Sequence, residues 1–197
     1  MMDNDRKNIL AKKGNTNMWW IIPVAIVVLI ALWLVSVYNK LVSAREFVRN
    51  SMGNIAAQIE SRWDAVRSLI DAAKKYSTHE AEVLTDITAM RGKVDRTSEP
   101  ADVEKDDNLF EQAMRQIDVV VENYPNLKAD GVYIQAMQGI DKYENNVRQA
   151  RMVYNDTVTR LNRMVQQFPS SIVAGLFGFN QEAYFESTSD KAKMPQW

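Results

Sequence analysis

Residues Trp19–Tyr38 read WWIIPVAIVVLIALWLVSVY, an apolar run in which no residue is charged. A helix rises about 1.5 Å per residue, so this run would be about 30 Å long and would match the hydrocarbon core of a bilayer. Trp19 and Trp20 stand at one end, and Trp33 and Tyr38 lie toward the other, as expected of rings at the headgroup level. We therefore predict a transmembrane helix over residues 19–38, anchored by these four aromatic side chains.

A cleaved signal peptide is the alternative for this end of the chain. Several basic residues precede the run, and Val42-Ser43-Ala44 loosely resembles a cleavage site. The apolar core of a signal peptide is about 7–15 residues long, and this run is longer, which favours an uncleaved anchor. Lys and Arg residues are nearly balanced between the two flanks, so the positive-inside rule leans only slightly toward a tail inside and a domain outside.

The composition of the chain excludes several classes of function. The formal net charge of −1 gives no reason to expect a nucleic-acid partner. The absence of cysteine excludes disulfides and thiolate metal sites. A di-metal centre in a helical bundle would need two Glu-x-x-His pairs, whereas the single histidine, His79, is adjacent to Glu80. No nucleophile elbow or phosphate-binding glycine loop is present, so we predict no catalytic, cofactor or metal site.

Beyond the apolar run the pattern is helical. From Leu41 to Tyr76 the apolar residues recur every three or four positions. Ser77-Thr78 is a cap or a kink before a second predicted helix, whose apolar positions extend from Val83 to Val94. We predict a loop over Thr97–Asp107. Asp106 to Asn108 then cap a third helix, whose inner face runs from Leu109 to Val121.

The predicted third helix breaks at Asn123-Tyr124-Pro125-Asn126, because proline lacks an N–H donor and disfavours helix for the residue before it. A fourth helix then extends from near Asn126 to Phe168, with a heptad stripe typical of a left-handed bundle or coiled coil. The expected all-α chain comprises a flexible polar tail (1–18), the transmembrane helix (19–38), an elongated antiparallel four-helix bundle (39–186) and a polar tail (187–197).

Charged residues interrupt the apolar faces of these predicted helices. Unpaired burial of a charge costs several kcal/mol, so such residues must form pairs or reach the surface. One interpretation is a polar network of salt bridges that fixes the register of the helices, and the other is a polar binding site inside the bundle. The residues concerned are Arg45, Arg62, Glu80, Arg91, Glu144 and Arg151.

The segment Ile172–Phe179, which follows Pro169, is short and strongly apolar. An even number of helices would return the chain toward the membrane at this point. The segment can fold back to cap the end of the bundle. Alternatively, Leu176, Phe177 and Phe179 dip into the membrane interface and hold the domain against the bilayer.

Several short motifs, spaced over about residues 38–186, together resemble the LemA family. They are Tyr38-Asn39-Lys40-Leu41-Val42 with Arg45, His79-Glu80 with Leu84 and Arg91, Glu122 to Ala129, Glu144, Ala150-Arg151, Tyr154-Asn155, Phe168-Pro169, Gly178-Phe179 and Tyr184-Phe185. The resemblance implies a bacterial, membrane-anchored, antiparallel helical bundle and supplies no enzyme activity. One departure is that Asp64 to Leu69 lacks the proline usual in the family, which puts a kink there in doubt.

These observations favour a non-catalytic scaffold or interaction protein that organises the membrane or a membrane-associated assembly. We expect it in the bacterial inner membrane, crossing once, with the domain on the outer, periplasmic side. Expected partners are the lipid bilayer and either further copies of the chain, as a homo-oligomer, or other membrane proteins. The alternative is a ligand- or partner-binding module that uses the Arg- and Glu-rich core.

Overall fold

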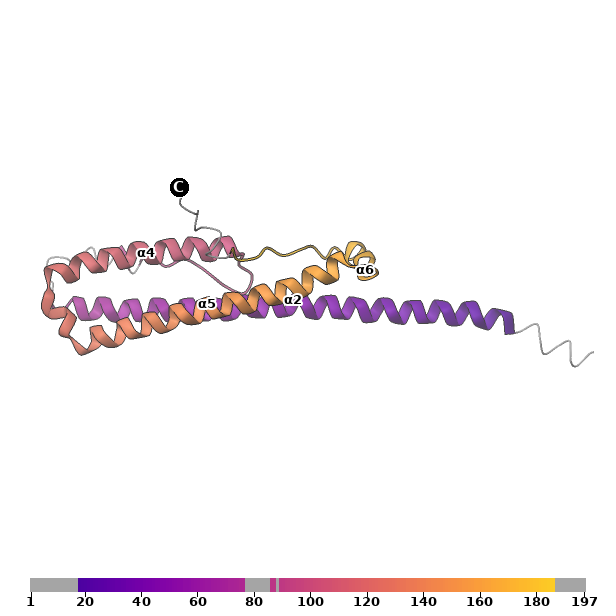
Figure 1. Ribbon diagram of the computed structural model, residues 1–197, viewed down its shortest axis with the longest axis horizontal. Helices are drawn as coiled ribbons and strands as arrows, with labels where there is room; N and C mark the ends of the chain where they lie inside the picture. The colour runs from indigo at the N-terminus through magenta and orange to yellow at the C-terminus, as the bar shows by residue number, and fades with distance from the viewer. Residues whose placement is uncertain (1–17, 77–85, 88, 187–197) are drawn as a thin grey trace, which may run out of the picture. The chain divides into compact units, whose positions relative to one another are not determined.

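The structure, a computed structural model, describes residues 18–76, 86–87 and 89–186. Over these residues the regular elements are helical and no strand occurs, which confirms the predicted all-α class (Figure 1). The elements are α2 (Met18–Ala73), α4 (Pro100–Asn123), the 3-10 helix η1 (Pro125–Ala129), α5 (Gly131–Gln166) and α6 (Ser170–Leu176). Of the predicted flexible tail (1–18), only Met18 lies within the described residues, and it already belongs to α2. The predicted polar tail (187–197) lies outside them.

The chain divides into two compact units. Unit 1 comprises Met1–Ser43 and Met164–Asn180, and unit 2 comprises Ala44–Arg163 and Gln181–Trp197. Both α2 and α5 contribute residues to each unit. The units are described separately below.

In unit 1, α2 carries the apolar run. It is the one described helix long and apolar enough to cross a membrane, with a mean hydropathy of 2.8 over its best window, of which only 6% is buried. A core helix of a water-soluble protein would bury most of such a stretch. Single-pass membrane anchoring is therefore consistent with the structure.

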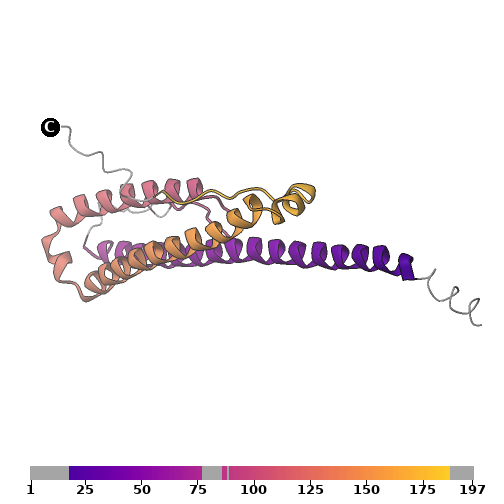
Figure 2. The same cartoon turned by 45° about the vertical axis from the view of Figure 1, so that its right-hand side comes forward.

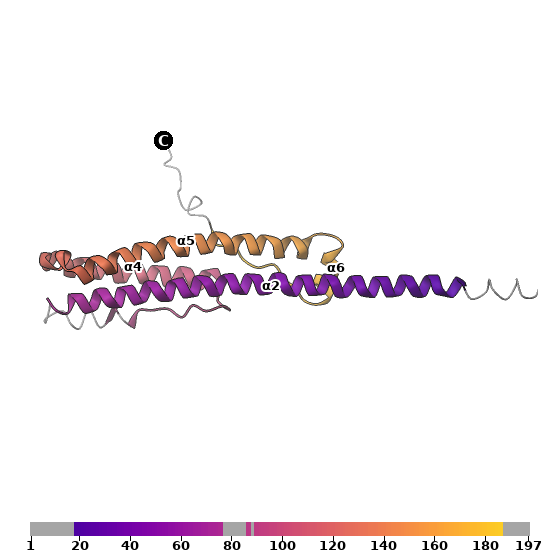
Figure 3. The ribbon, with the colours of Figure 1, turned by 90° about the horizontal axis from the view of Figure 1, so that it is seen from below.

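Unit 1 also contains α6, which lies beside α2 (Figure 3). Helix α6 ends at Leu176, and Gly178, two residues later, has a φ of 70° in the left-handed region that favours glycine. The N–H of Phe179 donates to the carbonyl of Ala174 (2.9 Å), and the N–H of Phe177 donates to that of Val173 (3.1 Å). The first of these is the bond from C″ to C3 of a Schellman motif with Gly178 at C′, and the turn places Phe179 against the Tyr38 ring of α2.

In unit 2, the parts of α2, α4 and α5 that belong to it lie side by side (Figure 1 and Figure 2). The predicted apolar rhythm of α2 is confirmed by a row of buried side chains: Val48, Met52, Ile55, Ile59, Val66, Leu69 and Ala73. Contacts between α2 and α5 run in opposite chain order. Gln58 bonds Asn146, Arg62 bonds Glu144, and Tyr76, just after α2, bonds Asp130, just before α5.

The predicted loop over Thr97–Asp107 is wrong, because α4 already begins at Pro100. Proline is favoured at the first helical position, where its missing N–H would have no partner in any case. The carboxylate of Asp102 accepts the N–H of Glu99 (3.1 Å), which completes the helix start. Asp106 is therefore an interior residue of the helix and not a cap.

The second predicted helix is wrong at its end. Residues 77–85 and 88 lie outside the described residues, but the chain is non-helical from Met90 through Glu99. The N–H of Gly92 donates to the carboxylate of Asp106 (3.1 Å), and the carboxylate of Asp95 captures the N–H of Thr97 (2.7 Å). Side-chain acceptors thus replace the carbonyls that a helix would use.

The fourth predicted helix is shorter than expected. Pro125–Ala129 forms the separate helix η1, and α5 begins only at Gly131 and ends at Gln166. The carboxylate of Asp130 accepts the N–H groups of Val132 (2.8 Å) and Tyr133 (3.3 Å), so it caps the new start. Five residues of the predicted heptad stripe are buried, Ile140, Val147, Tyr154, Val158 and Leu161, whereas Phe168 is exposed.

Candidate functional site: a buried charge cluster

Arg62 is the centre of the polar interior of unit 2, with only 2% of its surface exposed. Its Nη1 donates to Glu144 (3.1 Å), and its Nη2 donates to Asp106 (3.0 Å) and Asp107 (3.1 Å). The guanidinium carbon lies 4.1 Å from the centre of the Phe110 ring. One arginine of α2 is therefore paired with carboxylates from both α4 and α5, and its flat face is covered by an aromatic ring.

Asp106 is fully buried and has several donors. Besides Arg62, its carboxylate accepts the indole N–H of Trp63 (3.0 Å to Oδ1) and the backbone N–H of Gly92 (3.1 Å). A Cβ atom at position 92 would lie 2.8 Å from this carboxylate, so glycine is required for the close approach. With this many donors, the hydrogen-bonding capacity of the buried carboxyl group is satisfied within the protein.

Arg151 of α5 extends the pairing. It forms an ion pair with Asp107, and its guanidinium carbon lies 5.1 Å from the centre of the Phe185 ring. We call Arg62, Asp106, Asp107, Glu144 and Arg151 the charge cluster. Its two arginines and three carboxylates come from three helices and pair with one another.

The structure brings together three of the predicted polar residues, Arg62, Glu144 and Arg151. Arg91 instead pairs with Glu60 at 3.0 Å, outside the cluster. Arg45 is half-buried on α2, and Glu80 lies outside the described residues.

Sequence reasoning missed Asp106, Asp107 and Trp63. The signal was available, because Val103, Asp106, Phe110, Ala113 and Ile117 share one helical face and are all buried. The sequence prediction did not use this pattern, because it placed both aspartates in a loop before the third helix.

Two asparagines of α5 hold the segment 181–186, which sequence reasoning also missed. The side-chain amide of Asn162 exchanges two hydrogen bonds with the backbone of Glu182 (3.0 and 2.9 Å). Asn155 does the same with Phe185 (3.0 and 2.9 Å). Between them, the hydroxyl of Tyr154 donates to the carbonyl of Ala183 (3.3 Å), and burial raises the pKa of Tyr154 to about 12. These bonds place Phe185 over Arg151.

A groove of about 510 Å³ borders the charge cluster. Arg62, Asp107, Glu144 and Arg151 lie on its wall together with Phe110 and Phe185. These four charges already pair with one another, and the charged side chains of Glu111, Arg148 and Glu186 also line the groove. No group of three or more His, Cys, Asp or Glu residues in the described ranges could hold a metal ion.

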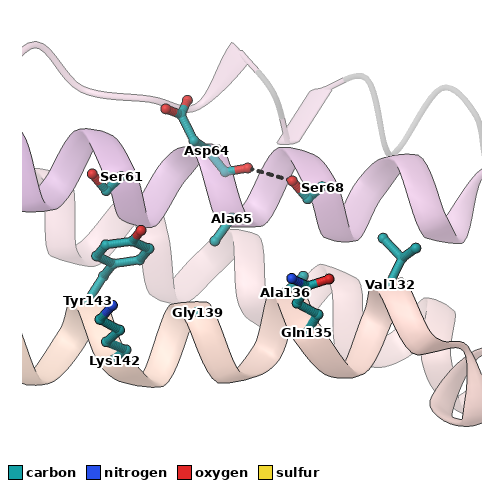
Figure 4. Close-up of a pocket in the computed structure, with 10 residues that line it drawn as sticks. All are labelled: Ser61, Asp64, Ala65, Ser68, Val132, Gln135, Ala136, Gly139, Lys142 and Tyr143. Carbon is teal, nitrogen blue, oxygen red and sulfur yellow. Dashed lines mark hydrogen bonds between the residues drawn. The ribbon is translucent and has the colours of Figure 1, made fainter.

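A second groove, of about 520 Å³, lies between α2 and α5 (Figure 4). Small side chains form its floor, among them Ala65, Ala136 and Gly139. A Cβ atom at Gly139 would be 3.6 Å from that of Ala65, an ordinary contact, so the helices are close here. The polar bond drawn in this groove, from the Ser68 hydroxyl to the Asp64 carbonyl (3.1 Å), is internal to α2. Polar side chains also line this groove, among them Ser61, Lys142 and Tyr143.

The residues predicted to contact the membrane lie in unit 1. Trp19, Trp20, Trp33 and Tyr38 are exposed on α2. Leu176 and Phe177 are exposed as well, whereas Phe179 is only 6% exposed. The rings of Phe177 and Phe179 lie 4.8 Å and 5.9 Å from the ring of Tyr38.

One candidate membrane-spanning helix among the described residues, together with an all-helical fold, is consistent with a single-pass membrane-anchored helical protein. The model of the LemA family matches residues 51–196. The protein named Protein LemA of Metamycoplasma hominis is 26% identical over 155 residues, which cover 76% of this chain and 69% of that relative. The chain belongs to the LemA family, as the sequence motifs predicted.

Proposed function

We propose that the protein is a membrane-anchored, non-catalytic helical scaffold or interaction protein that organises the membrane or a membrane-associated assembly. The observation that carries this proposal is the pairing inside the charge cluster. Arg62 engages three carboxylates, and Asp106 accepts from Arg62, Trp63 and Gly92. An acid or base catalyst needs a proton or a lone pair within reach of a substrate, and these groups are committed to one another.

The proposed architecture is an antiparallel four-helix bundle. The opposite chain order of the α2 and α5 contacts supports this arrangement. The candidate for the fourth helix of the bundle includes Ile87, which is helical and fully buried. In this scheme the charge cluster fixes the register of the helices, as polar seam residues do in coiled coils.

Assembly would then use the outer faces of the long helices. Val119 on α4 is apolar and exposed, and so are Met152 and Val153, which are consecutive on α5. Such surfaces suit further copies of the chain or other membrane proteins.

We propose that the protein lies in the inner membrane with unit 2 on the outer side. A reporter fused after Trp197 would test this orientation.

The experiment is the mass of the full-length protein in mild detergent over a range of concentrations. We expect large oligomers, which shrink when Met152→Glu and Val153→Glu are combined. The matched control is Asn108→Glu with Gln112→Glu, which adds the same two charges at exposed polar positions of α4. A monodisperse monomer at every concentration contradicts the proposal. Crosslinking in native membranes then identifies the partner.

The second candidate function is a ligand- or partner-binding module. The groove beside the charge cluster favours it, because Arg151 and Glu144 both line that groove. Combining Glu144→Leu with Arg151→Met separates the two proposals. Unchanged stability with loss of a bound partner supports a binding site, whereas a change in folding alone supports a structural role.

A further inference from the structure

Unit 1 contains a second uncharged segment besides the apolar run. From Met164 to Gln181 the chain has no Asp, Glu, Lys or Arg. This segment coincides with the second part of unit 1, Met164–Asn180. Two uncharged stretches far apart in the sequence thus form one compact unit.

The second uncharged segment has a buried side and an exposed side. Val173, Ala174 and Phe179 are buried. Phe168, Ile172 and Leu176, spaced four residues apart, are all exposed, with 73% of Leu176 accessible, and Phe177 is exposed beside them. Water would penalise a cluster of large apolar side chains at this exposure, and such patches mark contact with a partner or a membrane.

Tyr38 relates this exposed side to the membrane. It ends the charge-free run of α2, and Lys40 follows closely as the first charge. Tyrosine at such a position lies at the headgroup level of a bilayer. Because the Phe177 ring lies 4.8 Å from the Tyr38 ring, the exposed side of the segment sits at a similar depth.

We propose that Phe168, Ile172, Leu176 and Phe177 form an interfacial membrane-binding surface, which inserts into the headgroup and acyl-chain boundary of the bilayer that α2 spans. The occupant is lipid because the surface is continuous, through Tyr38, with the lipid-facing run of α2. The protein would therefore contact the membrane through two segments. This inference rests on the membrane anchoring in the proposed function.

The test uses single cysteines, because the chain has none of its own. The full-length protein carries an environment-sensitive fluorophore at Leu176→Cys and is reconstituted into vesicles of phosphatidylcholine and phosphatidylglycerol. Matched labels at Leu29→Cys, in the apolar run, and Ile134→Cys, on α5, replace apolar residues that are also exposed. Quenchers are iodide in water and lipids with a nitroxide at a shallow or deep position of the acyl chain.

We expect a blue-shifted emission at position 176 with quenching by the shallow nitroxide, quenching at 29 by the deep nitroxide, and quenching at 134 by iodide. If 176 responds like 134 while 29 responds to lipid, the interfacial surface is refuted and the anchor stands. If 29 also responds only to iodide, membrane anchoring itself fails. If 176 is protected from all quenchers, protein covers the surface and the inference is wrong.

Discussion

The same helix, α2, serves two opposite patterns of burial. In unit 1 nearly every side chain of its apolar run is exposed, and Ile30 is 52% accessible. In unit 2 the apolar side chains of α2 are buried, Ile55 completely, and the charged Arg62 lies among them. In water, burial of apolar side chains stabilises a helix. In lipid this driving force is absent, because the lipid tails are as apolar as the side chains. The contrast is therefore between a part whose exposed apolar surface suits lipid and a part that folds around a cluster of paired charges.

The largest expected effect comes from breaking the polar centre with Arg62→Met. The three carboxylates around position 62 would lose their shared cation while remaining in place, and loss of one partner from a buried ion pair costs about 3–5 kcal/mol. Denaturant unfolding of the full-length protein in mild detergent, followed by circular dichroism, measures the loss. Arg91→Met is the control, since its partly exposed pair with Glu60 is worth about 0–1 kcal/mol. Equal losses would refute a special role for the cluster.

The two parts of α2 can be compared directly by making an isoleucine-to-alanine substitution in each. Ile55→Ala removes a fully buried side chain and should destabilise unit 2 by about 2–5 kcal/mol. Ile30→Ala removes the same atoms from a side chain that is half exposed, and the free energy of unfolding of unit 2 should stay unchanged. The same unfolding measurement checks both. A comparable loss from Ile30→Ala would show that the apolar run is packed against protein.

A smaller effect is expected at the turn that positions the second uncharged segment. Gly178→Ala places a Cβ atom on a residue with φ of 70°, which should cost about 1–2 kcal/mol. Gly175→Ala, inside α6 with open space around its Cβ, should be neutral or slightly stabilising. Thermal unfolding in detergent compares the two variants. If both behave alike, the left-handed turn does not hold Phe179 against Tyr38.

The smallest effect concerns the start of α5. The N–H of Val132, more than that of Tyr133, lowers the pKa of the Asp130 carboxyl from its ordinary value. A lowered folded-state pKa means that the stabilisation is present above the unfolded pKa of about 3.9 and is lost as the pH falls through the folded value. Asp130→Asn keeps an acceptor oxygen without the titration, so unfolding measured from pH 6 to pH 2 should show a weaker acid dependence. An unchanged pH profile would contradict this cap.

Periodicity predicted the parts of the fold that depend on burial along one helix. The buried face of α2 follows its apolar rhythm from Val48 to Ala73, and the stripe of α5 does so from Ile140 to Leu161. Helix ends were less predictable because they depend on individual side-chain hydrogen bonds. Asp102 starts α4 earlier than expected, and Asp130 starts α5 later.

The site was predictable only in part. Arg62, Glu144 and Arg151 were singled out because they are charges on apolar faces. Their partners Asp106 and Asp107 are 44 and 45 residues from Arg62 in sequence, and no local pattern states which charges meet over such a separation. The same applies to the hydrogen bonds of Asn155 and Asn162, which join α5 to backbone 30 and 20 residues further along the chain.

The most direct test of the central contrast maps lipid contact over the whole chain at once. The full-length protein is reconstituted with a phosphatidylcholine that carries a photoactivatable group on its acyl chain, irradiated, digested and analysed by mass spectrometry. The account predicts lipid adducts within residues 19–38 and 168–177 and none at Val119, Met152 or Val153, although these three are also apolar and exposed. Adducts spread evenly over both units, or confined to the helices of unit 2, would contradict it.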